Sequence, residues 1–178
     1  DALSFCYADT IWPDKPDTFR CSWEAYYNEM EKLAARVMIV FTYALGIDSD
    51  FFAKCIDNPI SALRALNYPE QKMGVEENQL RAGAHSDYGS LTILLPQEGS
   101  TGLEILSPTN VWESVPTVPN TFIINIGDLM AMWTNDRWVS TLHRVVNSGS
   151  KRKRQSLAYF HQPNWSAEIT CLSSCLGH

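Results

Sequence analysis

HSDYGSLT, residues 85–92, is the stretch that decides how the rest of this chain folds, together with STLHRVV at 140–146 and RQS at 154–156. On a β-strand, residues i and i+2 point to the same face, so His85 and Asp87 can reach one point, and Arg154 and Ser156 another. His143, from a distant strand, would add a second imidazole to the first pair. Two imidazoles and one carboxylate on one side of a metal ion leave its other coordination positions open. The three motifs therefore predict a metal site beside an anion site.

Short strand-like runs surround these motifs, with glycine, proline and asparagine at the turns between them. The runs are 61–68, 79–85, 91–95, 103–106, 111–115, 121–126, 143–147 and 154–161. One break in the pattern, at 128–133, indicates a single helical turn, and the polar residues 70–78 indicate a loop. Many short strands of this kind favour a jelly roll or a related double-sheet barrel.

A long amphipathic helix precedes the strands. Apolar residues recur at helical spacing from Trp23 to Leu45, with Ser22 as the expected N-cap and Gly46 as the expected stop. A second, short helix is expected from Asp48 to about residue 56. The sequence therefore predicts an α+β fold with a mostly β core: a helical flank at 1–59 packs on a core at 60–178, and the two form one structural unit.

Length, composition and charge bound the function. The 178 residues suit one domain, and 45% hydrophobic with 19% charged residues is ordinary for a globular protein. A net charge of -6 argues against nucleic acid or an anionic membrane as the main partner. No run is long and apolar enough for a membrane span, and no signal peptide is visible. Five cysteines without a CxxC pair indicate reduced thiols and a cytoplasmic protein.

Several alternatives remain open at the level of residues. Imidazole and carboxylate ligands suit zinc as well as iron, but zinc-dependent hydrolysis usually needs a further carboxylate, for which Glu98 and Glu104 are the candidates. Cys171 and Cys175 form a weaker candidate metal pair. The basic run 151–154 could be a nuclear signal or a polyanion patch, with Arg154 on the surface. The acidic balance of the chain favours a solvated turn in which Arg154 alone faces inward.

Arg154 inside a barrel would need a partner, because a buried arginine is costly unless it is paired. A ligand carboxylate held by both guanidinium nitrogens would supply one, with the Ser156 hydroxyl as a further donor. Tyr68 could add a phenolic donor from the opposite sheet. Strand phase suggests, as candidates to line the pocket, Leu80, Ile93, Leu95 or Phe160.

These motifs, taken in order, resemble the Fe(II)/2-oxoglutarate-dependent dioxygenase superfamily, in the branch of isopenicillin N synthase. HSDYGSLT looks like the His-x-Asp motif of that branch, STLHRV its second-histidine motif and RQS its Arg-x-Ser motif. NIGDL at 125–129, WTN at 133–135 and NYP at 67–69 are also similar. The spacing fits too, since 58 positions separate His85 from His143 and 11 separate His143 from Arg154.

The resemblance implies a double-stranded β-helix that holds Fe(II) through His85, Asp87 and His143, with no catalytic residue beyond these ligands. It further implies 2-oxoglutarate as co-substrate, bound by Arg154, Ser156 and Tyr68. Such an enzyme oxidises a small organic molecule with O2 by hydroxylation, desaturation or ring chemistry and releases succinate and CO2. We expect a cytoplasmic monomer with no nucleic-acid or membrane partner.

Two other functions remain open. One is an oxidase that uses the same iron site without 2-oxoglutarate, as isopenicillin N synthase does, with Arg154 and Ser156 gripping the substrate. The other is a truncated β-helix that only binds a small molecule. The chain begins at Asp1 rather than at methionine and matches the branch from about Trp12 to Cys175, so we expect that both ends are truncated.

Overall fold

The computed structural model describes residues 10–70, 79–147 and 153–177, so the loop expected at 70–78 falls almost wholly outside the described residues. Within the described ranges the chain forms one long helix, one short helix, eight strands and two short 3-10 turns. In chain order these are α2 (Phe19–Leu45), η1 (Ala53–Cys55), β1 (Ala62–Tyr68), β2 (Leu80–His85), β3 (Leu91–Pro96), β4 (Leu103–Leu106), β5 (Trp112–Ser114), β6 (Ile123–Ile126), α3 (Asp128–Trp133), β7 (His143–Val146), β8 (Arg154–His161) and η2 (Ser173–Cys175). The predicted α+β class with a mostly β core is confirmed.

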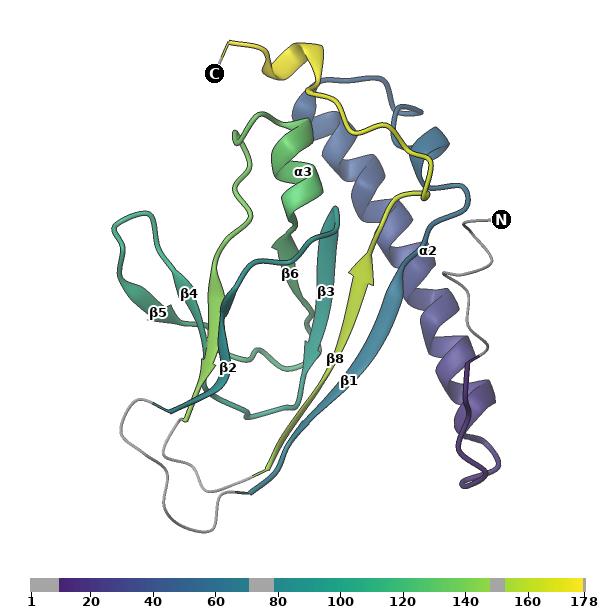
Figure 1. The fold of residues 1–178 in the computed structure, drawn as a ribbon, viewed down its shortest axis with the longest axis vertical. Helices are drawn as coiled ribbons and strands as arrows, with labels where there is room; N and C mark the ends of the chain where they lie inside the picture. The colour runs from purple at the N-terminus through teal and green to yellow at the C-terminus, as the bar shows by residue number, and fades with distance from the viewer. Residues whose placement is uncertain (1–9, 71–78, 148–152, 178) are drawn as a thin grey trace.

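Two antiparallel sheets of four strands face each other (Figure 1). Their strand orders are β1-β8-β3-β6 and β2-β7-β4-β5, so strands far apart in the sequence become neighbours. This alternation between sheets is the pattern of a jelly roll, and it confirms the predicted double-stranded β-helix. Its consequence for the site is direct, because β2 and β7 place residues 85 and 143 side by side.

Helix α2 lies against the outer face of the first sheet, next to β8 and β3 (Figure 1). Its buried residues recur every three or four positions, which is the spacing of one helical face. This face is formed by Met30, Ala34, Met38, Thr42 and Leu45. It packs with Leu91, Ile93 and Tyr159 of the sheet into one apolar core. This core joins the predicted helical flank to the sheet. The boundary predicted between residues 59 and 60 stays a prediction.

The ends of α2 match the sequence unequally. Gly46 ends the helix in the left-handed region at φ 64°, as predicted. The start differs, because the helix begins at Phe19 after Thr18 rather than after Ser22. Two contacts extend the first turn: the Phe19 ring stacks on Trp23 with centroids 5.7 Å apart, and Arg20 pairs with Glu24 at 2.8 Å.

The short helix predicted after Asp48 is wrong. Asp48 accepts the backbone N–H of Asp50 at 2.9 Å, which closes a turn instead of capping a helix. Only the 3-10 turn Ala53–Cys55 follows. Burial explains the preference, since Phe52 is 1% exposed and meets the Trp133 ring edge-on at 5.0 Å. Burial of the Phe52 ring in the core therefore outweighs the hydrogen bonds of a regular helix in this segment.

No helix within the described ranges is long and apolar enough to cross a membrane. The described cysteines, which exclude Cys6, are all free thiols. Cys171 and Cys175 do not form part of any cluster of three metal-ligating side chains in the described part of the chain.

A buried polar pair fastens the end of β8 to the start of β3. Ser90 Oγ lies 2.5 Å from His161 Nδ1, and the Ser90 N–H donates to the His161 carbonyl at 3.0 Å. Both residues are essentially inaccessible, at 0% and 1%. Burial disfavours the charged imidazole and lowers the pKa of His161 to about 4.

This imidazole is expected to make the fold less stable as the pH falls from 6.5 towards 4. The unfolded chain takes up a proton with the ordinary pKa of 6.5, whereas the folded imidazole stays neutral until about pH 4. The free energy of unfolding is therefore unaffected by this group above pH 6.5, and it drops by roughly 3 kcal/mol by pH 4. Urea unfolding across this range measures the drop. His161→Asn keeps an acceptor for Ser90 but does not titrate, so its pH dependence should be shallower; equal slopes would assign the effect to other groups.

Candidate metal centre

A cavity of about 210 Å³ lies between the two sheets. Every strand except β5 contributes to its wall, and its lining includes all six residues that the motifs predicted: Tyr68, His85, Asp87, His143, Arg154 and Ser156. The sequence therefore located the cavity correctly.

The two histidines come from neighbouring strands in direct register. His85 ends β2, His143 begins β7, and their rings lie 4.3 Å apart between centroids. Each ring donates from Nδ1 to a backbone carbonyl: His85 to Gly83 at 2.8 Å and His143 to Thr141 at 3.1 Å. These bonds fix the tautomer, because a donating Nδ1 leaves Nε2 with its lone pair. Both imidazoles are thus prepared as metal ligands, oriented by the kind of outer hydrogen bond that ligating histidines use.

Asp87 reaches the same point by a different route from the one predicted. Strand β2 ends at His85, so Asp87 lies in the following turn and not on the strand face. The turn is held by backbone bonds, since the Asp87 carbonyl accepts the Asp128 N–H at 2.8 Å. Its neighbours approach very closely: a Cβ on Gly127 would lie 2.0 Å from the Gly89 carbonyl oxygen, so only glycine fits there. The start of α3, and not strand alternation, positions this carboxylate.

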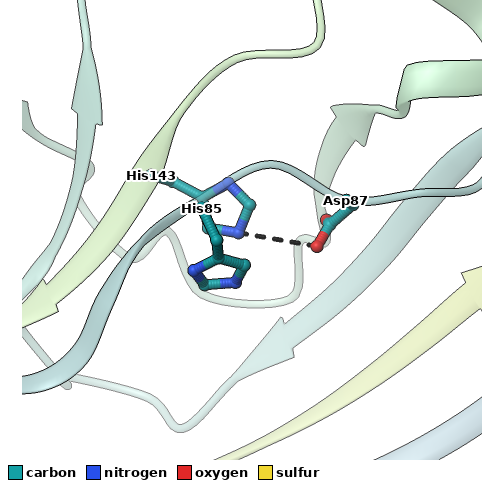
Figure 2. A group of neighbouring side chains, drawn as sticks. All are labelled: His85, Asp87 and His143. Atoms are coloured by element: carbon teal, nitrogen blue, oxygen red, sulfur yellow. Dashed lines mark ion pairs between the residues drawn. The ribbon is translucent and has the colours of Figure 1, made fainter.

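The three side chains converge (Figure 2), with one possible ligand atom from each lying within 4.8 Å of the other two. Asp87 Oδ1 lies 3.7 Å from His143 Nε2. Asp87 is 6% exposed, and its Oδ2 has no hydrogen-bond partner among the described residues. A buried carboxylate oxygen without a partner costs about 1–3 kcal/mol. A divalent cation would satisfy it, so the donor set fits a metal ion, and two imidazoles with one carboxylate fit Fe(II).

A zinc hydrolase finds no support at this site. Glu104, one candidate for the extra carboxylate, is taken by Arg144 at 2.8 Å. Glu98 is exposed, and neither glutamate belongs to the lining of the cavity. Among the described residues that line the cavity, Asp87 is the only carboxylate.

The predicted anion site lies on the other sheet. Arg154 and Ser156 are both buried and both line the cavity, which confirms the strand phase of RQS. Arg154 is 4% exposed, forms no salt bridge with a described residue and leaves Nε without a partner among them. Burial lowers the pKa of this guanidinium, and the neighbouring Tyr68 opposes the shift. A buried arginine without a carboxylate is costly, so the site favours an anionic ligand.

The prediction that Tyr68 comes from the opposite sheet is wrong. Tyr68 ends β1, which pairs with β8 in the same sheet, and it lies directly across from Arg154. The guanidinium carbon is 5.2 Å from the centroid of the Tyr68 ring. Tyr68 is therefore a wall of the arginine pocket and not a donor facing it from across the barrel.

The basic run is only partly described, since residues 151 and 152 lie outside the described residues. Within what is described, Lys153 is exposed and Arg154 is buried. The inward orientation predicted for Arg154 is confirmed.

The pocket wall was predicted less well. Of the four residues suggested by strand phase, Phe160 lines the cavity, whereas Leu80, Ile93 and Leu95 do not. Ile93 faces α2 in the outer core, and its neighbours Thr92 and Leu94 face the cavity. Three polar lining residues were also missed: Arg64, Thr92 and Asn125. A signal for Arg64 was present, because Arg64 and Tyr68 stand four positions apart on one strand and so share a face.

Comparison with known proteins gives a consistent result. The family model described as 2OG-Fe(II) oxygenase superfamily matches residues 59–163. The chain is 33% identical to a homoarginine-6-hydroxylase of Glycine max over 168 residues, covering 92% of this chain and 50% of that protein. It is 35% identical to a 2-oxoglutarate-dependent dioxygenase of Aspergillus niger over 164 residues, covering 90% of this chain and 51% of that one. The chain thus spans about half the length of the curated relatives it matches.

Solved structures agree with the sequence comparison. A full-length Neurospora crassa protein in complex with alpha-KG superposes with a TM-score of 0.87 at 32% identity, covering 94% of this chain and 54% of that one. JOX2 in complex with 2OG, Fe and JA superposes with a TM-score of 0.82 at 35% identity, covering 92% and 48%.

Proposed function

This chain belongs to the 2OG-Fe(II) oxygenase superfamily, and from that premise we propose that it is an Fe(II)- and 2-oxoglutarate-dependent oxygenase of a small organic molecule. One observation carries the proposal. A single cavity brings together two imidazoles from one sheet, a carboxylate from the segment that follows β2, and a buried arginine on the other sheet that has no carboxylate partner among the described residues. The reaction would consume O2 and release succinate and CO2.

In this proposal His85, Asp87 and His143 hold Fe(II). The two rings present Nε2 because their Nδ1 protons are committed to backbone carbonyls. Asp87 would neutralise part of the metal charge, and the metal ion would give a partner to its otherwise unpartnered carboxylate oxygen. When bound, Fe(II) and 2-oxoglutarate supply the redox chemistry, while the protein positions the reactants and shields them from water.

Arg154, Ser156 and Tyr68 hold the far carboxylate of 2-oxoglutarate. The guanidinium can donate two parallel bonds to a carboxylate, and the Ser156 hydroxyl, two residues further along β8 on the same face, can donate a third. Leu66, Leu94 and Leu103 add apolar wall beside these groups. Such a lining excludes water, which strengthens each charged contact.

Substrate size, setting and assembly belong to the same proposal. A small-molecule substrate is supported by relatives, since structures of the Neurospora crassa protein contain thymine or 5-formyluracil and the JOX2 structure contains JA. We place the activity in the cytoplasm and in a monomer, and the odd number of cysteines without a CxxC pair supports the compartment. Size-exclusion chromatography with light scattering measures the monomer directly.

Anaerobic titration tests the cofactor assignment. Fe(II) and 2-oxoglutarate together should give a weak visible charge-transfer band, because the keto acid chelates the metal through two oxygens. Succinate lacks the keto group and should give none under the same conditions. A band with 2-oxoglutarate supports the proposal. Iron binding without a band would favour an oxidase that does not use 2-oxoglutarate, and the absence of iron binding would leave only a small-molecule-binding β-helix.

A further inference from the structure

The cavity face of the first sheet carries two groups of polar side chains, with Leu66, Ala158 and Leu94 between them. Strand register arranges its lining residues in four successive rows across β1, β8, β3 and β6. In order, the rows are Tyr68–Arg154, Leu66–Ser156, Arg64–Ala158–Leu94 and Phe160–Thr92–Asn125. The first two rows form the proposed 2-oxoglutarate pocket. The last two rows contain polar groups for which the proposed function, so far, has no use.

Arg64 is the charged member of this second polar group. It stands two rows from Arg154, about 13 Å along the strand at ~3.3 Å per residue, so the two arginines cannot grip the same carboxylate. Its guanidinium carbon lies 5.3 Å from the centroid of the Phe160 ring, which holds the side chain over the cavity wall. Arg64 forms no salt bridge with any residue in the described ranges.

Thr92 and Asn125 complete the group. Thr92 is 3% exposed, and its hydroxyl has no hydrogen-bond partner among the described residues. Asn125 lies directly across from it on β6 and also lines the cavity. A buried hydroxyl without a partner is costly unless a ligand completes it. Thr92 is thus a second sign, independent of Arg64, that a polar ligand group belongs at this end.

Charge balance indicates which group that is. With the proposed cofactors bound, the double charge of Fe(II) and the single charge of Arg154 are balanced by Asp87 and the two carboxylates of 2-oxoglutarate. Among the described residues that line the cavity, Asp87 is the only carboxylate, so they supply no counter-charge for Arg64, whose side chain is exposed at the cavity wall. A cation facing a partly enclosed cavity attracts an anion and disfavours a cation.

We propose that the substrate is an organic acid whose carboxylate is bound by Arg64, with its apolar part against Phe160 and a hydrogen bond to Thr92 or Asn125. This inference rests on the proposed function and adds the substrate class to it. It also gives the two arginines separate tasks: Arg154 binds the co-substrate and Arg64 selects the substrate.

Matched acids and amides test the proposal on the anaerobic protein with Fe(II) and saturating 2-oxoglutarate. The probes are phenylacetate, cinnamate and octanoate, each compared with its primary amide. Binding of each probe is measured by the shift of the charge-transfer band and by calorimetry. At least one acid is expected to bind about 10-fold or more tightly than its amide, because the amide loses a charge-assisted bond. Arg64→Gln should remove this preference. Arg137→Gln, which changes an exposed arginine outside the cavity lining, should retain it.

The remaining variant and outcomes separate the possible failures. Thr92→Val keeps the shape of the side chain and should weaken acid and amide alike by a few-fold, through the lost hydrogen bond. A panel in which no acid is preferred, or a preference that survives in Arg64→Gln, overturns the inference while the band still supports the proposed function. Acids that abolish the band by competing with 2-oxoglutarate would bind at Arg154, and they also overturn it. Absence of the band in the wild-type protein overturns the proposed function first and this inference with it.

Discussion

Asp87→Asn is expected to abolish Fe(II)-dependent turnover without making the metal-free protein less stable. The variant keeps the size of the side chain but removes the one carboxylate that the described residues contribute to the cavity lining. Losing a metal ligand should weaken Fe(II) binding by more than about 100-fold, since even groups that merely orient ligands are worth about 10–100-fold. The opposite result is expected for folding, because Asp87 is buried and its Oδ2 has no described partner. Asparagine is uncharged and is less costly to bury than a carboxylate, so the metal-free variant should be at least as stable as the wild-type protein.

Two measurements on one variant therefore separate a metal ligand from a structural carboxylate. Fe(II) affinity is measured by anaerobic titration, and thermal unfolding is followed on metal-free protein. Asp136→Asn is the matched control, since Asp136 is exposed and lies outside the cavity lining, so it should leave both quantities unchanged. If Asp87→Asn lowered the melting temperature of the metal-free protein and left iron binding intact, Asp87 would be a structural residue and the metal centre would be misassigned.

The convergence of the candidate site residues was predictable from the sequence, although Asp87 does not lie on a strand as predicted. His143 and the Arg154–Ser156 pair lie on strands with the expected phase. Asp87 lies beyond its strand, and its position depends on the Asp128 N–H and on the close approach of Gly127 to Gly89. Contacts between segments some forty residues apart leave no periodic signal. Strand alternation therefore placed Arg154 with Ser156 correctly, whereas the convergence of Asp87 with the two histidines was predicted by the ordered set of motifs.

The cavity wall shows where pattern reasoning fails for a physical reason. Strand β3 is buried at four successive positions, Leu91 to Leu94, because one face packs on α2 and the other faces the cavity. A strand that is buried on both faces has no hydrophobic alternation, so its phase cannot be inferred from apolar residues. Thr92 was the one available clue. Its polar side chain indicates which face of β3 lines the cavity. From that phase, Leu94 and not Ile93 is predicted to line the cavity.

Arg154, like Asp87, is expected to be needed for ligand binding but not for the stability of the metal-free protein. Arg154→Met replaces a buried guanidinium that has no described carboxylate partner with an apolar chain of similar length. Exchanging unpaired or ionic buried groups for apolar ones is often neutral or stabilising, so the metal-free variant should unfold at the same temperature or higher. Affinity for 2-oxoglutarate should fall by about 2–5 kcal/mol, the cost of truncating one side of a buried charged pair. The affinity of Arg154→Lys for 2-oxoglutarate should lie between those of the wild-type protein and Arg154→Met, because lysine retains the charge but not the two parallel bonds.

Arg144→Met is the matched control with the reverse pattern. Arg144 donates to Glu104 at 2.8 Å, lies 4.1 Å from the Trp112 ring centroid and does not line the cavity. Its loss should lower stability modestly, because both contacts are broken, while 2-oxoglutarate binds as before. The charge-transfer titration measures 2-oxoglutarate binding, and calorimetry measures unfolding. Arg154→Met should therefore lose binding but not stability, and Arg144→Met should lose stability but not binding. Unchanged 2-oxoglutarate affinity in Arg154→Met would mean that the co-substrate binds elsewhere, and a large loss of stability would mean that Arg154 has a structural partner.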